Sequence, residues 1–291
     1  STYLISAAMS SCTSLTKCFT EFNNRCVDVG IAEEHSISLA NGIALNNGKP
    51  YVSLYSTFMQ RGYDQIVHDV CLQKLPVRLL LDRAGLAGED GATHHGVFDI
   101  AYLRCIPNLT IASPLNEAEL RNMLYTAQLP KKGTFVIRYP RGCGEGVDWK
   151  NQPFEEIPIG KAVCLQEGID VAVLAFGPIG NEAMRADNSL KCKVDSTVKQ
   201  LNTDSSVSRL VDSPECSEIA SSIGIYNMRF VKPLDEETLH HICQTYKRII
   251  TVEDGVLQGG FGSAVLEFMA DNGYSLPVKR IGIPNQFVEH G

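Results

Sequence analysis

Short apolar runs alternate with longer helix-like segments along the whole chain of 291 residues. This alternation predicts parallel strands joined by helices, because a crossover between parallel strands needs a dozen or more residues. A parallel sheet buries both of its faces, so helices are expected on each side of it. We therefore predict an α/β fold with two doubly wound domains. The predicted strands are residues 26–29, 51–55, 77–81, 109–112 and 135–139 in the first half, and 170–175, 224–227 and 248–252 in the second.

Helical periodicity marks the segments between these runs. Asn116, followed three residues later by Glu119, is typical of a capped helix start. The predicted helices are residues 34–46, 116–128, 233–246 and 262–272.

The chain is long enough for about two domains. A polar stretch that contains Gly and Pro separates its halves. We predict a first domain at residues 1–145, a linker at 146–160 and a second domain at 161–291. Residues 187–222 do not fit this pattern, because they are rich in Ser, Asp, Lys and Thr and show little periodicity. They represent a surface insertion, a divergent helix or an erroneous stretch of sequence, and the residues alone do not choose among these.

Composition narrows the class of protein. A net charge of −7 without a long basic stripe argues against a nucleic-acid binder, although a few arginines in a cleft would still suit an anionic substrate. No apolar run approaches the ~20 residues that span a bilayer, so no membrane segment is expected. The ten cysteines show no Cys-x-x-Cys pair, which favours reduced structural thiols over a metal site. These features indicate a cytoplasmic globular protein.

Acids, arginines and histidines concentrate near predicted strand ends, where α/β folds place their sites. Glu33 and Glu34 stand at a helix start, where either acid could simply complement the helix dipole. Arg61 and Asp64 are three residues apart, a spacing that also suits a surface ion pair. A glycine-rich loop combines Asp, Thr and two His, which turn chemistry alone explains poorly. The three phrases concerned are residues 28–35, 55–70 and 82–96.

Together with the later phrase Arg138-Tyr-Pro-Arg141-Gly, these segments closely resemble the 1-deoxy-D-xylulose-5-phosphate synthases, a family of transketolase-like thiamine-diphosphate enzymes. The resemblance covers only that family's second and third domains. It implies a pyrimidine-binding domain followed by a transketolase C-terminal-like domain. It also implies a transferase that condenses pyruvate with glyceraldehyde 3-phosphate, with loss of CO₂. The product, 1-deoxy-D-xylulose 5-phosphate, serves isoprenoid, thiamine and pyridoxal synthesis.

The resemblance assigns roles to residues of each phrase. Glu33 would hydrogen-bond the aminopyrimidine ring of thiamine diphosphate and promote the tautomer that activates the cofactor. Phe58 would stack against the same ring. Arg83 and Arg141 would hold the substrate phosphate, which a planar fork of donors suits. The residues implied as catalytic are Glu33, Arg61, Asp90 and His94, and those implied to contact substrate are Tyr55, Arg61, Arg83, Asp90, His94 and Arg141.

The same family binds the cofactor's diphosphate through Mg²⁺ in a domain that precedes the matched region and carries a Gly-Asp-Gly…Asn motif. No such motif occurs in this sequence, so no metal ligands are predicted in it. The end at His290-Gly291 also looks short of the family's last helix. We therefore expect the chain alone to be an incomplete catalyst. It would need a diphosphate-binding domain or chain, and it would form a homodimer.

Two other interpretations remain open. The β subunits of 2-oxo-acid dehydrogenases and other split thiamine enzymes have the same two-domain content. The phrases Tyr-Pro-Arg-Gly, Leu-Gln-Lys-Leu-Pro and Asp-Gly-Ala-Thr-His-His favour the synthase over a split enzyme. A non-catalytic remnant is the third interpretation. The retained acids and arginines argue against long-term loss of function, but a recent truncation would also leave them intact.

Overall fold

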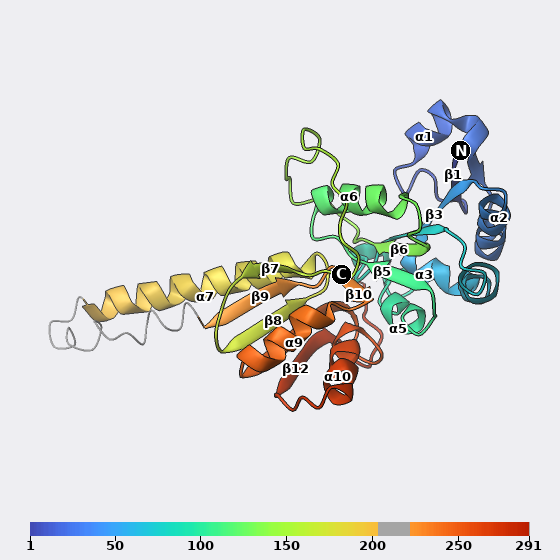
Figure 1. The fold of residues 1–291 in the computed structure, drawn as a ribbon. Coiled ribbons are helices and arrows are strands. Elements are labelled where there is room, and N and C mark those ends of the chain that lie inside the picture. Colours follow the sequence, from blue (N-terminus) through green and yellow to red (C-terminus); the bar gives the residue numbers. More distant parts are fainter. Residues whose placement is uncertain (203–221, 291) are drawn as a thin grey trace.

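A computed structural model describes residues 1–202 and 222–290, and it contains two β-sheets with helices packed on them (Figure 1). This architecture confirms the predicted α/β fold. In the first half the elements, with η for 3₁₀ and π helices, are β1 (Thr2–Ser6), α1 (Thr16–Glu21), η1 (Asn23–Arg25), β2 (Cys26–Asp28), α2 (Glu33–Leu45), β3 (Lys49–Tyr55), α3 (Ser56–Met59), η2 (Gln60–Gly62), α4 (Tyr63–Gln65), η3 (Ile66–Cys71), β4 (Arg78–Asp82), η4 (Gly88–Asp90), α5 (Asp99–Leu103), β5 (Leu109–Ala112), α6 (Glu117–Ala127) and β6 (Thr134–Arg138). In the second half they are β7 (Val163–Gln166), β8 (Val171–Ala175), α7 (Ile179–Asn202), β9 (Ile223–Asn227), β10 (Phe230–Lys232), α9 (Glu236–Thr245), β11 (Arg248–Val256), α10 (Phe261–Asp271) and β12 (Val278–Ile283).

The first sheet has seven strands in the order β10-β5-β6-β4-β3-β1-β2, and all of its pairings except that of β10 with β5 are parallel. The chain runs from β1 to β2 in one direction and then crosses back over β1 to reach β3. Because parallel crossovers are right-handed, this reversal puts α1 and α2 on opposite faces. Helix α6 shares the face of α1, and α2, α3 and α5 cover the other (Figure 1). The point of reversal, between β1 and β3, is where such sheets form a crevice.

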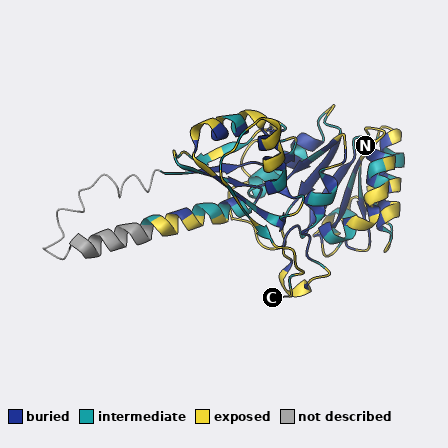
Figure 2. Cartoon of the chain, turned by 90° about the horizontal axis from the view of Figure 1, so that it is seen from below, coloured by how far each residue is buried: buried dark blue, intermediate teal, exposed yellow. Residues whose placement is uncertain are grey.

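Burial alternates along the central strands of this sheet. Leu79 and Leu81 of β4 pack into the core beneath α2, whereas Leu80 packs with Met123 and Ala127 of α6. The period of two follows from the pleat of a strand, which points successive side chains to opposite faces. The strands are mostly buried and the outward faces of the covering helices are exposed (Figure 2). The sheet is thus a buried platform whose strand ends carry the polar residues.

The second sheet has five strands in the order β12-β11-β8-β9-β7, with β7 antiparallel at its edge. Strand β10 leaves this domain and pairs antiparallel with β5 of the first sheet, where Phe230 lies opposite Ala112. The two halves are therefore joined by a strand as well as by side chains.

The predicted strands and helices are all present, with ends displaced by no more than a few residues. Four strands were not predicted: β1, β7, β10 and β12. Helix α7 was also missed, and it includes residues 187–202 of the atypical segment. Of the three interpretations of that segment, this part fits a divergent helix, and residues 203–221 lie outside the described residues. No helix among the described residues has both the length and the apolar composition to cross a membrane.

Candidate functional site

All eight side chains implied by the sequence lie in one connected cluster at the carboxyl ends of strands in the first sheet. They come from four segments that follow β2, β3, β4 and β6. Each member contacts the next through an ion pair, a ring contact or a cation–π contact. In spatial order the cluster is Glu33, Arg61, Phe58, Tyr55 with His94, Arg83, Asp90 and Arg141.

One end of the cluster is a buried carboxylate. Glu33 is the first residue of α2 and is only 3% exposed, whereas Glu34 is exposed. Arg61 donates from Nη1 to Glu33 Oε1 at 2.7 Å, although the arginine side chain is itself 53% exposed. The surface ion pair between Arg61 and Asp64 does not form, because Asp64 instead accepts His68 Nδ1 at 3.0 Å. Geometry thus separates two glutamates that look equivalent in the sequence.

An aromatic wall follows this carboxylate. The rings of Tyr55 and Phe58 stack with centroids 5.5 Å apart and an interplanar angle of 12°. The His94 ring meets Phe58 edge-on at 5.4 Å. The Arg61 guanidinium lies 5.4 Å from the Phe58 centroid, and so joins the wall to Glu33. This arrangement offers a flat apolar surface with an imidazole at one edge and a carboxylate beyond the other.

Burial raises the pKa of Tyr55 to about 12, aided by a hydrogen bond with Cys12 and opposed by the charge of Arg83. Tyr55 therefore keeps its hydroxyl proton at neutral pH. The Arg83 guanidinium lies 3.9 Å from the Tyr55 ring centroid and donates to the Cys12 carbonyl at 3.3 Å. The prediction of site residues missed Cys12, because β1, whose carboxyl end leads to it, was not predicted as a strand.

The other end of the cluster holds two arginines on one carboxylate. Asp90 Oδ2 lies 3.7 Å from Arg83 Nε and 3.6 Å from Arg141 Nη1. Arg141 also donates to the Ala87 carbonyl at 2.8 Å, and Asp82 at the end of β4 forms an ion pair with Arg83, with Asp82 Oδ2 3.1 Å from Arg83 Nη1. Burial raises the pKa of Asp82, and the charge and hydrogen bonds of Arg83 oppose that effect. The result is a network of two arginines and two aspartates beside the aromatic wall.

The loop that carries these groups is tightly closed. Gly85 and Gly96 exchange two backbone hydrogen bonds of 2.8 Å each, which bring its two ends together. Arg83 adopts a left-handed φ of 58°, an uncommon conformation for a non-glycine residue that is often found at functional sites. His95 is buried, and its Nδ1 accepts the Ala87 N–H at 2.9 Å, so it stabilises the loop and does not face the cluster.

Among the side chains that the structure describes, in residues 1–191 and 222–290, no group of three or more His, Cys, Asp or Glu is placed to hold a metal ion. A hollow of about 740 Å³ lies elsewhere, between α1 and α6 on the other side of the first sheet. Its walls are mostly apolar, and none of the eight cluster residues lines it. The residue cluster and this hollow are therefore separate features of the molecule.

The fold agrees with comparisons to known families. Residues 1–145 match the model of the transketolase pyrimidine binding domain, and residues 215–291 match that of the transketolase C-terminal domain. Together these matches cover more than half of the sequence, and the chain belongs to the transketolase-like family. Within that family it is similar to the second and third domains of the 1-deoxy-D-xylulose-5-phosphate synthases.

The curated relatives are much longer than this chain. The synthase of Bacteroides thetaiotaomicron is 53% identical over 287 residues, which are 99% of this chain and 40% of that protein. The synthase of Parabacteroides distasonis is also 53% identical, over 99% of this chain and 41% of its own length. The chain thus spans about two fifths of the relatives that it matches.

Solved structures show the same fold at lower identity. A split gene transketolase, described as an inactive β₄ tetramer, superposes with a TM-score of 0.78 at 24% identity, over 98% of this chain and 84% of that one. The transketolase of Campylobacter jejuni gives a TM-score of 0.71 at 16% identity, over 100% of this chain and 40% of that one.

Proposed function

We propose that this chain supplies the pyrimidine-binding and C-terminal domains of a 1-deoxy-D-xylulose-5-phosphate synthase. The reaction joins pyruvate to glyceraldehyde 3-phosphate with loss of CO₂. The observation that carries the proposal is the layout of the cluster, in which a buried carboxylate lies at one end of an aromatic wall and two arginines on Asp90 lie at the other. The 53% identity to curated synthases supports it. In the cell we expect a cytoplasmic homodimer that also contains a diphosphate-binding domain.

The donor groups fit the pyrimidine part of thiamine diphosphate. Glu33 provides a buried carboxylate, and Phe58 provides a half-buried ring next to Arg61, which is bound to that carboxylate. An aminopyrimidine has ring nitrogens for a carboxyl group and a flat face for an aromatic ring. When bound, the cofactor supplies a carbon nucleophile that accepts and transfers a two-carbon unit. Its Mg²⁺ and diphosphate would be held by the diphosphate-binding domain.

Each residue of the cluster would then have a separate role in the reaction. Glu33 holds a proton at a ring nitrogen of the cofactor, and Arg61 fixes the position of its Oε1. Phe58 and Tyr55 exclude water from one side of the reacting carbon. His94, at the edge of this wall, would give a proton to the carbonyl oxygen of the acceptor aldehyde.

The arginines would bind the acceptor's phosphate. Arg83 and Arg141 present their guanidinium groups to the same oxygen of Asp90, so their donors converge on one point. A phosphate dianion can accept from both forks at once. Asp90 reduces the repulsion between the two cations and keeps them side by side.

The test is reconstitution. The chain is mixed with a separately expressed diphosphate-binding domain of a related synthase, thiamine diphosphate and Mg²⁺. CO₂ release from pyruvate is measured with and without glyceraldehyde 3-phosphate, and the product is identified by mass spectrometry. We expect pyruvate consumption and 1-deoxy-D-xylulose 5-phosphate, with little turnover by the chain alone. A mixture that uses ketose phosphates as donors and ignores pyruvate would support a split transketolase instead, and a mixture inert with both donors would support a non-catalytic remnant.

A further inference from the structure

We propose that Asp254, in the second domain, is a positioning residue for the substrate loop, defined as residues 83–96 of the first domain. It would act through Arg138 and Gly85. The inference rests on the proposed function for the identity of the ligand, but not for the order of the loop. It would give the second domain a role in acceptor binding although none of the eight cluster residues belongs to it.

The first step is a buried ion triad that crosses the domain boundary. Arg138, at the end of β6, is 1% exposed. Its Nε donates to Asp99 Oδ2 at 2.8 Å, and its Nη1 donates to Asp254 Oδ1 at 2.6 Å. Asp99 begins α5 directly after the substrate loop, and its Oδ1 accepts the backbone N–H of Ile100 at 2.8 Å. The triad thus ties the exit of the loop, the end of β6 and the end of β11 together.

The second step is the contact of Asp254 with the closed end of the loop. Gly85 has a φ of +79°, and a Cβ built on it would lie 2.8 Å from Asp254 Oδ2 and 3.1 Å from the Asp254 Cβ. Side chain and glycine backbone are therefore in close contact. Gly85 forms two backbone hydrogen bonds with Gly96, so the carboxylate lies beside one of the two residues that close the loop. Arg83 lies only two residues away on the same strand of chain.

Backbone contacts extend this support along the loop. Val256 donates its N–H to the Val97 carbonyl at 2.9 Å, two residues beyond Asp254 on the same strand. His95 Nδ1 accepts from Ala87, which leaves Nε2 as the donor to the Glu289 carbonyl at 3.3 Å. The second domain therefore contacts the loop at its closed end, at its exit and through a buried histidine.

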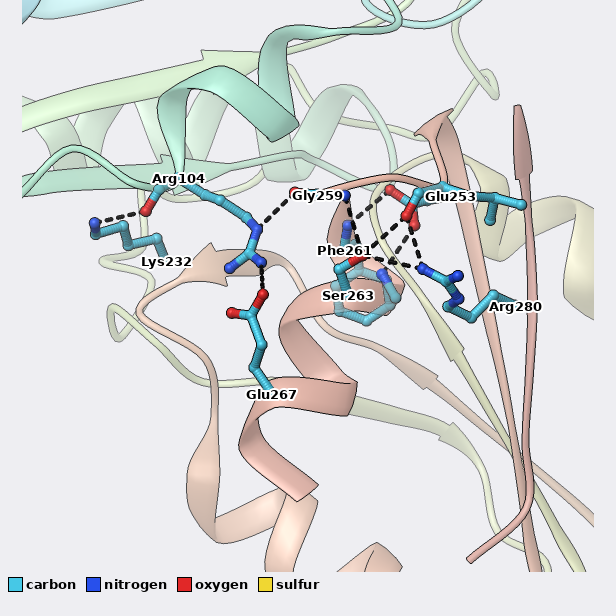
Figure 3. Close-up of polar contacts among 10 residues, drawn as sticks. Arg104, Lys232, Glu253, Gly259, Phe261, Ser263, Glu267 and Arg280 are labelled. Atoms are coloured by element: carbon cyan, nitrogen blue, oxygen red, sulfur yellow. Dashed lines mark hydrogen bonds and ion pairs between the residues drawn. The ribbon is translucent and has the colours of Figure 1, made fainter. Parts of the chain in front are cut away.

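A second ion pair across the boundary provides a matched control. Arg104 of the first domain donates to the Gly259 carbonyl at 2.6 Å and pairs with Glu267 of α10 (Figure 3). The side chain of Glu267 is 61% exposed, and its partner lies after α5, beyond the substrate loop. Glu267→Gln removes an interdomain charge pair without touching the loop. A general loosening of the two domains would affect both variants, whereas positioning of the loop concerns only Asp254.

Amide hydrogen exchange on the chain, followed by mass spectrometry, tests the proposal without any need for activity. In Asp254→Ala, peptides covering residues 83–97 should exchange at least about tenfold faster, the factor expected for loss of one charge-assisted hydrogen bond. Asp254→Asn can keep one hydrogen bond from Arg138, so a smaller increase is expected. Peptides from α2 should be unchanged in both, and Glu267→Gln should match wild type throughout. If the alanine variant does not fold, the asparagine variant decides.

Unchanged exchange over residues 83–97 in the folded Asp254 variants would overturn the proposal, as would an equal increase in Glu267→Gln or an equal increase in α2. A second readout uses the reconstituted enzyme. Asp254→Asn should raise KM for glyceraldehyde 3-phosphate about tenfold and leave proton exchange at the thiazolium carbon unchanged. Equal loss in both steps would indicate a merely structural role. An enzyme that never uses the phosphorylated aldehyde would contradict the proposed function and leave the exchange result standing.

Discussion

The two domains can be compared at the carboxyl ends of their strands, because both sheets are mainly parallel and the segments that follow these strand ends are rich in acids and glycine in both. In the first domain, the side chains of Arg61, Asp90 and Arg141 keep substantial exposure. In the second domain, the acidic side chains at the end of β11 form hydrogen bonds and ion pairs within the protein. The same place in an α/β fold thus keeps charged side chains exposed in one domain and uses them for internal contacts in the other.

The second domain illustrates this in two adjacent residues, Glu253 and Asp254. Glu253 accepts hydrogen bonds from the backbone N–H groups of Phe261 at 2.7 Å and Gly262 at 2.8 Å. Its carboxylate therefore occupies the N-terminus of α10, a position at which helices commonly bind phosphate. Asp254 pairs with Arg138 of the first domain. Strand-end location is therefore a weak guide to function on its own, and the two domains differ in how far the paired charges stay exposed to solvent.

The largest effect in this comparison is expected at Glu33. In the reconstituted enzyme, Glu33→Gln should slow hydrogen–deuterium exchange at the thiazolium carbon by roughly 10²–10⁴-fold, because a positioned acid–base group is lost. NMR measures the exchange. Glu34→Gln is the matched control, since Glu34 is exposed on the same helix turn, and it should change little. Equal rates in wild type and Glu33→Gln would remove the assignment, and a larger effect at Glu34 would transfer it.

The next effect concerns the arginines on Asp90. Arg83→Ala or Arg141→Ala should lower kcat/KM for glyceraldehyde 3-phosphate by roughly 10- to 150-fold, the value of one charged hydrogen bond. Unphosphorylated glyceraldehyde should be affected much less. Arg141→Lys keeps the charge but loses the planar fork, so it should recover only part of the loss. If both aldehydes lose efficiency equally, the arginines are structural and the phosphate binds elsewhere.

A third prediction concerns the contacts between the two domains. Glu119 of α6 accepts Arg229 Nε at 2.6 Å and Asn227 Nδ2 at 3.1 Å, both from the second domain. Glu119→Gln should lower the free energy of unfolding by about 1.5–3 kcal/mol, as expected for a hydrogen bond to a charged group. Glu117→Gln, on the same helix but bound to an exposed loop amide, should lower the free energy of unfolding much less. Chemical denaturation measures both, and similar losses would show that Glu119 has no special role at the boundary.

The smallest effect is a pH dependence at Glu253. Burial raises its pKa to about 7, against the opposing hydrogen bonds of Gly262 and Phe261, from an ordinary value of 4.5. The folded protein then holds this proton more tightly than the unfolded chain does. The contribution to stability is full below pH 4.5 and is lost as the pH rises through about 7. Melting temperatures between pH 5 and 8 should show wild type losing stability relative to Glu253→Gln, and a constant difference would contradict the raised pKa.

Local patterns were enough to predict most central strands and the two long helices of the first domain. The start of α6 is an example, since Asn116 accepts the Glu119 N–H at 3.0 Å as the capping pattern predicts. Local sequence patterns did not predict strands that form only by pairing with a distant part of the chain. Strand β10 is three residues long and exists because β5 of the other domain presents an edge to it. Edge strands of this length carry too few alternating residues to be recognised in isolation.

For the candidate site, too, some features could be predicted from the sequence and others required the structure. The eight cluster members were predicted from the family resemblance, which matches residue types and their order along the chain. Both of these can be read from the sequence without a structure. The sequence could not rank Glu33 above Glu34 by physics, since both stand at a helix start. Burial beside Arg61 separates them in three dimensions.

The sequence by itself determined the alternating strands and helices, the two-domain content and the inventory of charged groups, because these depend on neighbours within a few residues. Only the tertiary structure decided which charges meet. Arg138 and Asp254 are 116 residues apart, and their 2.6 Å contact exists because two separately wound sheets dock with these strand ends facing each other. Electrostatic pairing of buried groups depends on distance in space, and no local pattern encodes that distance.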